Sequence, residues 1–183
     1  QLLKAGGRAA LVLPDGFLFG EGIKTRIKEK LLEECNLHTI VRLPNGVFSP
    51  YTGIKTNLLF FSKGTPTQHI WFYEHPYPPG VKSYNKTKPM KIEEFDAEAV
   101  WWGSEADGFK QREENEYAWK VNLEDIKARN YNLDCKNPHI GEQEIHDPKV
   151  LLAKYNAMQN DITKLRGQLK DILGEALQRE NKA

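Results

Sequence analysis

The hydrophobic pattern of the first half of the chain predicts strands separated by one amphipathic helix. Residues Arg8–Pro14 (RAALVLP) are a short, nearly unbroken apolar run, which is typical of a strand covered on both faces. In residues 22–36 apolar side chains return every three to four positions and Lys and Glu fill the other faces, which predicts a helix. A second apolar run at 37–44 predicts another strand. The order strand, helix, strand favours a parallel pair with a right-handed connection.

Two more apolar runs predict strands at 57–63 and 69–73. The short link between them contains Gly64 and Pro66, so these two strands are expected to form an antiparallel hairpin. From residue 75 to near residue 116 few apolar positions are periodic, and an ordered but irregular excursion is expected.

Within this excursion, residues 76–91 contain no acidic side chain. The basic side chains of this stretch are Lys82, Lys86, Lys88 and Lys91. The residues favour a solvated loop, since several lysines on one flexible segment are common, and leave contact with phosphate groups as the alternative.

The last segment predicts a long helix with an apolar seam. It opens with Asp147 and Pro148, an N-cap residue followed by the residue preferred at the first helical position. Apolar residues follow an unbroken four-three spacing as in a coiled coil: Leu151, Tyr155, Met158, Ile162, Leu165, Leu169, Ile172 and Ala176. Gly167 and Gly174 lie at outward positions of this helix, and each lowers its stability by about 1 kcal/mol relative to alanine. The helix is therefore expected to rely on a partner surface, in this chain or in another subunit.

Composition bounds the class of protein without naming a partner. The 183 residues are 39% hydrophobic and 28% charged, which is typical of a soluble globular protein. No apolar run reaches the roughly 18 residues that a membrane helix needs, so a cytoplasmic location without membrane contact is expected. A formal net charge of +1 means that any DNA-binding hypothesis depends on local patches. Cys35 and Cys135 are expected to be reduced thiols, and no metal-ligand spacing is present.

Two strand ends carry similar turns, Leu13-Pro14-Asp15-Gly16-Phe17 and Leu43-Pro44-Asn45-Gly46-Val47-Phe48. In open α/β sheets ligands bind at the carboxyl ends of strands, so these turns mark where a site is expected. Ending the strands is an equally simple role for them. The sequence contains no nucleophile-base motif and no glycine-rich phosphate loop.

These turns lie in segments that resemble the N6-adenine DNA methylases. Residues 6–18 (GGRAALVLPDGFL) resemble the stretch that follows the family's catalytic motif. Residues 40–48 (IVRLPNGVF) and 53–63 (GIKTNLLFFSK) look like its "LP-x-GVF … IKTN-x-LFF-x-K" block. Residues 130–133 (NYNL) resemble its later "YNL" motif. In order and spacing these segments are most similar to the methyltransferase (modification) subunit of type I restriction-modification systems, over nearly the whole chain.

The resemblance implies an α/β fold class. The chain would form the C-terminal part of a Rossmann-like methyltransferase sheet and supply its final three strands, the last of them inserted antiparallel. An irregular segment and the long heptad-patterned helix would follow. The expected domains are the C-terminal part of a catalytic domain (1–74), an irregular α/β extension (75–146) and a helix for subunit assembly (147–183).

The resemblance also implies roles for a few residues. The family binds S-adenosylmethionine through a glycine-containing turn and contacts the target adenine with an Asn-Pro-Pro-Phe/Tyr motif. Neither occurs in this sequence, so no catalytic residue is assigned, the methyl donor is expected to bind mainly to a missing N-terminal part, and the fragment alone is expected to be inactive. Phe48 matches the phenylalanine that stacks on the flipped-out adenine, although core packing would also explain it. Lys55 and Thr56 are candidate contacts to the DNA backbone.

The implied function is adenine-N6 methylation of double-stranded DNA, with S-adenosylmethionine as methyl donor, within a type I complex. The expected partners are the specificity subunit, whose helical spacers would pack on residues 148–179, the restriction subunit and a second modification subunit. An alternative from another class is a non-catalytic assembly or nucleic-acid-binding module. A single-chain type II methylase is a lesser alternative, because the stretch between the fourth strand and the long helix looks short for a target-recognition domain.

Overall fold

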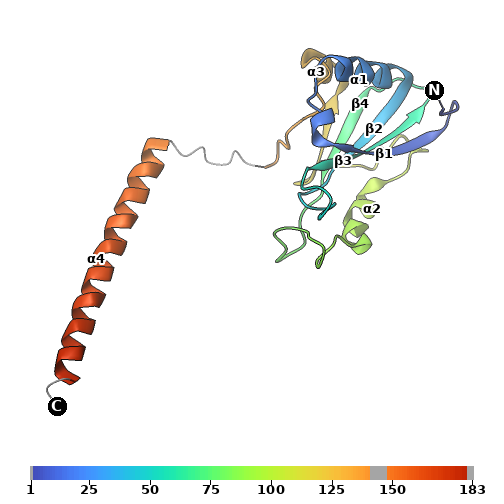
Figure 1. The fold of residues 1–183 in the computed structure, drawn as a ribbon. Coiled ribbons are helices and arrows are strands. Elements are labelled where there is room, and N and C mark those ends of the chain that lie inside the picture. Colours follow the sequence, from blue (N-terminus) through green and yellow to red (C-terminus); the bar gives the residue numbers. More distant parts are fainter. Residues whose placement is uncertain (1, 141–147, 181–183) are drawn as a thin grey trace. The chain divides into compact units, whose positions relative to one another are not determined.

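The computed structural model describes residues 2–140 and 148–180. The chain divides into two units, residues 1–140 and 141–183, and each is described by itself. The first unit is a mixed α/β fold built on one five-stranded sheet of order β1-β3-β2-β4-β5 (Figure 1). Its strands are β1 (Arg8–Pro14), β2 (Cys35–Arg42), β3 (Thr56–Lys63), β4 (His69–Glu74) and β5 (Ala118–Asn122). Its helices are α1 (Ile23–Glu34), α2 (Asp96–Trp102) and α3 (Leu123–Ala128), with 3-10 turns η1 (Asp15–Phe17) and η2 (Ile92–Phe95).

Helices cover both faces of the sheet, so two cores form (Figure 1). One core lies under α1 and α3, where Leu32 and Ile126 pack with strand residues such as Ile40 and Phe72. The other lies under α2; its buried members are Val41, Leu43, Tyr73 and Ala118, with Trp101 and Trp102 against them. Alternation of side chains along the strands explains why Ile40 and Val41, neighbours in β2, enter different cores.

The predicted elements of the first half are present, with β1 at its predicted bounds. β3 runs antiparallel to both β1 and β2, which is the direction predicted for the inserted strand, and it lies between them. The predicted parallel pairing of the first two strands is wrong. β1 and β2 run in the same direction, but β3 separates them.

The predicted hairpin of β3 and β4 is also wrong. β4 pairs parallel with β2 and antiparallel with β5, so it lies on the other side of β2 from β3. The link between β3 and β4 therefore crosses β2, and Thr67 fixes this link by two hydrogen bonds. Its buried hydroxyl donates to the carbonyl oxygen of Cys35 (2.7 Å) and accepts from the backbone N–H of Leu37 (2.8 Å). These bonds hold the link across the start of β2 and direct the chain to the far side of that strand.

β1 is not covered on both faces, contrary to the prediction from its apolar run. It is the edge strand of the sheet, and Leu11 and Val12 are about half exposed on opposite faces. A continuous apolar run has the same sequence pattern whether or not a neighbour covers the strand, so the pattern could not distinguish the two cases.

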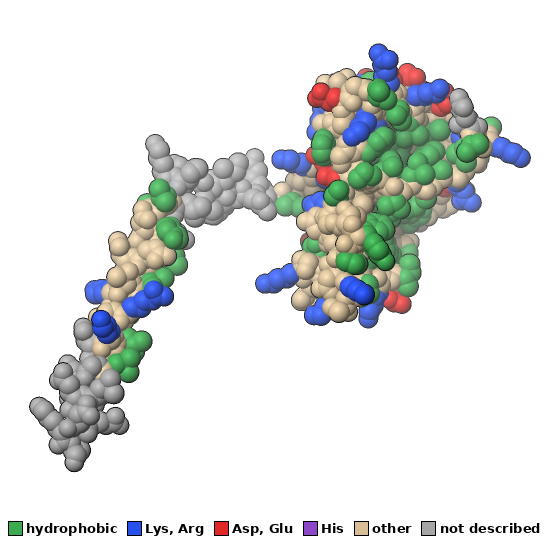
Figure 2. Space-filling view, in the orientation of Figure 1, with side chains coloured by type: hydrophobic (Ala, Val, Ile, Leu, Met, Phe, Trp, Pro, Cys, Tyr) green, Lys and Arg blue, Asp and Glu red, His purple; other side chains and the backbone are tan. Residues whose placement is uncertain are grey.

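The described part of the second unit is α4 (Pro148–Glu180), a helix of 33 residues. Figure 2 shows hydrophobic side chains along one side of it. The seam side chains that the structure describes are 41% to 64% exposed: Tyr155, Met158, Ile162, Leu165, Leu169 and Ile172. The side chain of Leu151 lies outside the described residues.

Candidate functional site

A pocket of about 460 Å³ opens where β1, β2 and β4 end and β3 begins. Both turns singled out from the sequence contribute to it. The lining residues are Asp15, Arg42, Leu43, Pro44, Asn45, Lys55, Asn57, Glu74, His75, Pro76, Tyr77, Glu116, Tyr117, His139 and Ile140. The site therefore lies at the carboxyl edge of the same-direction strands, where an α/β sheet is expected to bind a ligand.

Asp15, Arg42 and Asn57 form the polar floor of this pocket and come from three different strand ends. Asn57, which is only 1% exposed, donates from Nδ2 to Oδ1 of Asp15 (3.1 Å). Nη2 of Arg42 lies 3.7 Å from the same carboxylate oxygen. The carboxylate of Asp15 is thus engaged by an amide and a guanidinium, and it joins β1, β2 and β3 at this edge.

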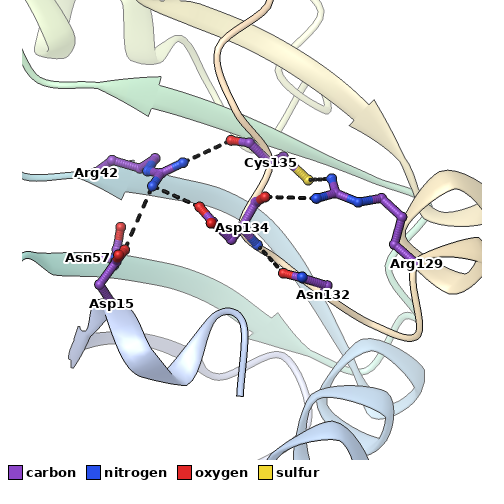
Figure 3. Close-up of polar contacts among 7 residues, drawn as sticks. All are labelled: Asp15, Arg42, Asn57, Arg129, Asn132, Asp134 and Cys135. Atoms are coloured by element: carbon purple, nitrogen blue, oxygen red, sulfur yellow. Dashed lines mark hydrogen bonds and ion pairs between the residues drawn. The ribbon is translucent and has the colours of Figure 1, made fainter. Parts of the chain in front are cut away.

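Arg42 also binds the segment that follows the "YNL" motif (Figure 3). Its Nη1 donates to the carbonyl oxygen of Cys135 (2.9 Å), and its Nη2 lies 2.9 Å from Oδ1 of Asp134. Arg129 holds the same segment from the other side, donating to the carbonyl oxygen of Asp134 (2.9 Å) and to Sγ of Cys135 (3.2 Å). Together with buried Leu133, these contacts fasten residues 130–135 beside the end of β2.

The thiol beside the pocket, that of Cys135, is buried and is not suited to act as a nucleophile. Burial raises the pKa of Cys135, against the opposing effect of Arg129, so the thiol stays protonated near neutral pH. Among the described residues, Cys35 and Cys135 are free thiols, and no cluster of three His, Cys, Asp or Glu side chains could hold a metal ion. Lys55 is exposed and lies on the rim of the pocket.

The loop 44–55 projects from this edge and is fixed by its own hydrogen bonds. The backbone N–H of Ser49 donates to Gly46 (2.9 Å), and the N–H groups of Tyr51 and Thr52 both donate to the carbonyl oxygen of Phe48 (2.9 and 3.1 Å). The loop exposes Phe48 to 39% and Tyr51 to 93%. Exposed aromatic rings on a turn of fixed shape are available for stacking without a large ordering cost.

The three predicted DNA-contact residues occupy different environments. Phe48 is at the surface of the loop and outside both cores, so the core-packing alternative for its ring receives no support. Lys55 lines the pocket. Thr56 is buried, and its hydroxyl has no hydrogen-bond partner among the described groups. Their roles toward DNA stay predictions.

Sequence reasoning missed the polar floor of the pocket. Arg42 is the charged last residue of β2, and Asp134 directly follows the "YNL" motif. A charged residue at the end of a buried strand was the one local signal available, and it does not reveal a partner far along the chain.

The sequence model of the family described as N-6 DNA Methylase matches residues 1–148. This chain belongs to the N-6 DNA methylase family. The resemblance to type I modification subunits is confirmed, because the chain is 68% identical over 177 residues to the type I restriction enzyme EcoEI methylase subunit of Escherichia coli.

Solved structures agree with this family membership. A chain from a structure on complex assembly and conformational transition of the type I R-M system has a TM-score of 0.69 at 35% identity, over 94% of this chain and 37% of that one. The type I restriction enzyme EcoKI M protein has a TM-score of 0.62 at 28% identity, over 91% of this chain and 41% of that one. The EcoEI alignment covers 97% of this chain but 36% of that relative, so the chain corresponds to one part of such methylase subunits.

Proposed function

We propose that this chain is part of a DNA (adenine-N6)-methyltransferase, the modification subunit of a type I restriction-modification complex. The observation that carries the proposal is the pocket at the carboxyl edge of the sheet. The family's "LP-x-GVF … IKTN" block supplies its wall and rim through Leu43, Pro44, Asn45, Lys55 and Asn57. We infer that residues 1–74 are the C-terminal part of a Rossmann-like sheet and that residues 75–146 extend it.

In this proposal the loop 44–55 acts on the target nucleotide. A base cannot be methylated while it is stacked in the duplex, and moving it out costs a few kcal/mol. Phe48 would offset part of that cost by stacking on the extruded adenine, and Lys55 would contact a backbone phosphate nearby. Thr56 is the weaker phosphate candidate because its side chain is buried.

The methyl group would come from S-adenosylmethionine, and no residue described here is assigned to hold it. Asp15, the acidic group on the pocket floor, is already engaged by Asn57 and Arg42, so it does not fit a cofactor ligand. We therefore propose that the donor binds mainly outside this chain and that the chain alone does not transfer methyl groups.

The exposed seam of α4 supports a role in assembly. Helices that expose an apolar stripe at heptad spacing bury it against other helices. We propose that residues 148–179 pack on helical spacers of the specificity subunit, within a complex that also contains a second modification subunit and the restriction subunit. Such a complex would act on DNA in the cytoplasm.

The test is methyl transfer by the complete modification protein, co-expressed with its specificity subunit. The complex is incubated with duplex DNA and labelled S-adenosylmethionine, and the nucleosides are then separated. The proposal expects N6-methyladenine, with no transfer by residues 1–183 alone. Label on cytosine, or DNA binding without transfer, would contradict the proposal; the second result would favour the alternative of a non-catalytic assembly or nucleic-acid-binding module.

A further inference from the structure

The lysine-rich stretch that the sequence left ambiguous has a defined shape in the structure. Asn85 and Lys88 exchange two backbone hydrogen bonds of 3.1 Å, which close a tight turn. The side chain of Asn85 accepts three more, from the backbone N–H groups of Thr87 and Lys88 and from the hydroxyl of Thr87. The lysines of this turn therefore project from a backbone that is already ordered.

This turn is anchored at its base by a buried tyrosine. Tyr84 is 5% exposed and donates its hydroxyl to the carboxylate of Glu94. The other oxygen of Glu94 accepts from the backbone N–H of Lys91 (2.8 Å). The acidic side chain at the end of the segment is thus used internally, and it helps to fix the turn.

The same segment is joined to the loop 44–55 at two points. Tyr77 donates its hydroxyl to the carbonyl oxygen of Asn45 (2.9 Å). Gly46 lies so close to Tyr84 that an added Cβ atom would stand 2.7 Å from that residue's carbonyl oxygen. Residues 77–91 and the loop that carries Phe48 and Lys55 therefore form one continuous surface, which we call the lysine surface.

The charge of the lysine surface is uncompensated within its own segment. The four lysines of residues 77–91 are exposed, residues 76–91 contain no acid, and none of these four forms an ion pair among the residues that the structure describes. Figure 2 shows Lys and Arg side chains spaced around the end of the first unit where Figure 1 draws the loops below the sheet. Exposed ammonium groups without partners are suited to contact phosphates as point charges.

We propose that the lysine surface binds the phosphate backbone of duplex DNA beside the pocket. The inference rests on the proposed DNA methyltransferase function and goes beyond Phe48 and Lys55. Contacts of this kind carry no sequence information, but they fix how the protein lies on the duplex. Because the turn is joined to the loop 44–55, phosphates held by the lysines would set the position of the DNA relative to Phe48.

The test is the salt dependence of duplex binding by the complete methylase complex. The variant carries Lys82→Gln, Lys86→Gln and Lys88→Gln, which remove charge and keep the backbone of the turn. A matched control removes three exposed lysines elsewhere on the unit, Lys30→Gln, Lys110→Gln and Lys127→Gln. Affinity for a specific and an unrelated duplex is measured by fluorescence anisotropy at several salt concentrations.

Each phosphate contact contributes about 0.9 to the slope of log K against log salt, so the triple variant should lower the slope by about 2 to 3. Both duplexes should weaken equally, and the control should keep the original slope. An unchanged slope in the triple variant would overturn the inference, as would loss of subunit assembly with normal DNA binding, which would indicate an acidic protein partner. Nucleoside analysis on the same samples tests the methyltransferase proposal separately. If the triple variant lowers the slope but the unmodified complex forms no N6-methyladenine, the methyltransferase proposal is contradicted and the phosphate contact of the lysine surface is retained.

Discussion

Arg42 at the end of β2 donates a hydrogen bond of 2.9 Å from Nη1 to the carbonyl oxygen of Cys135, a residue 93 positions later. Its second terminal nitrogen lies 2.9 Å from the carboxylate of Asp134. One planar guanidinium thus holds two groups of the same segment, and it also approaches Asp15 on the pocket floor. Together with Arg129 and buried Leu133, this side chain holds residues 130–135 beside the pocket.

Replacing Arg42 should therefore destabilise the fold by more than removing an exposed charged side chain would. Arg42→Ala leaves the Cys135 carbonyl and the Asp134 carboxylate without their partner, and we expect the free energy of unfolding to fall by about 1 to 2 kcal/mol, a range that allows for the partial exposure of the pair. Arg42→Lys should recover little, because an ammonium group cannot reproduce the two-directional fork. Urea denaturation measures both.

Arg8 offers a matched control, since its ion pair with Glu105 is long (3.7 Å) and exposed. Arg8→Ala should change the free energy of unfolding by less than about 0.5 kcal/mol. Equal effects of Arg8→Ala and Arg42→Ala would show that the Arg42 contacts contribute nothing beyond an ordinary surface charge.

Gly46 and Gly53 lie in the same loop and should respond differently to alanine. Gly46 has a φ of 82° and no room for a Cβ atom beside Tyr84, whereas an added Cβ on Gly53 meets nothing within 4 Å. Gly46→Ala should lower the free energy of unfolding by about 1 to 2 kcal/mol through the left-handed backbone alone. The contact of the added Cβ atom with the carbonyl oxygen of Tyr84 should lower it further. Gly53→Ala should be nearly neutral in thermal denaturation. Similar melting temperatures would contradict the close packing of the two loops.

His38 should make the stability of the protein sensitive to mild acid. Burial lowers its pKa to about 4, the nearby charge of Arg112 lowers it as well, and Glu105 acts in the opposite direction. The unfolded chain titrates near 6.5, so between these values the unfolded state binds more protons than the folded state. The stabilising contribution of neutral His38 is complete above pH 6.5 and is lost as the pH falls toward 4.

This shift corresponds to about 3 kcal/mol over the full window. His38→Gln should therefore reduce the loss of unfolding free energy between pH 7.5 and pH 4.5, measured by urea denaturation at both pH values. Glutamine can keep a hydrogen bond to Thr39, and the comparison uses the pH dependence of each protein, so a uniform loss of stability does not affect the result. Identical pH dependence in both proteins would contradict the assignment.

The sequence predicted individual elements better than their partners. The apolar run that ends at Pro14 was sufficient for β1, and helical periodicity was sufficient for α1. The neighbours of β4 could not be predicted, because the hydrogen bonds of the buried Thr67 hydroxyl, which hold the link across the start of β2, are tertiary contacts with no local pattern. β5 was missed because it is short and only Ala118 and Trp119 are buried at its start.

The candidate site likewise has a part that the sequence predicted and a part that only the structure revealed. The turns at the strand ends and the family block located the pocket wall, and Lys55, predicted as a contact to the DNA backbone, lies on the pocket's rim. The connection between Arg42 and Asp134 joins residues far apart in sequence, and without a second sequence no local signal reveals such a pair. The lysine surface was visible as composition, but its shape required the contacts of Tyr77 and Tyr84 with the loop 44–55.

The exposed seam of α4 predicts how the complex assembles. Ile162→Asp with Leu169→Asp places two charges in the seam, and we expect it to abolish co-purification of the methylase with its specificity subunit. Asn160→Asp with Thr163→Asp adds the same charges on the outward faces and should leave co-purification intact. Deletion of residues 148–179 should match the seam variant. Normal assembly of the seam variant would contradict the proposed role of the helix.

In the proposed function the carboxyl edge of the sheet receives the target base, and a substitution at Phe48 examines this placement. The measurement is the affinity of the complete enzyme for a duplex whose target adenine is mispaired, compared with a fully paired duplex. Stacking on one base contributes about 1 to 3 kcal/mol, so Phe48→Ala should weaken binding of the mispaired duplex roughly 5-fold to 150-fold, and Phe48→Trp should retain it. Unchanged affinity and unchanged methyl transfer in Phe48→Ala would contradict the placement of the target base at this edge.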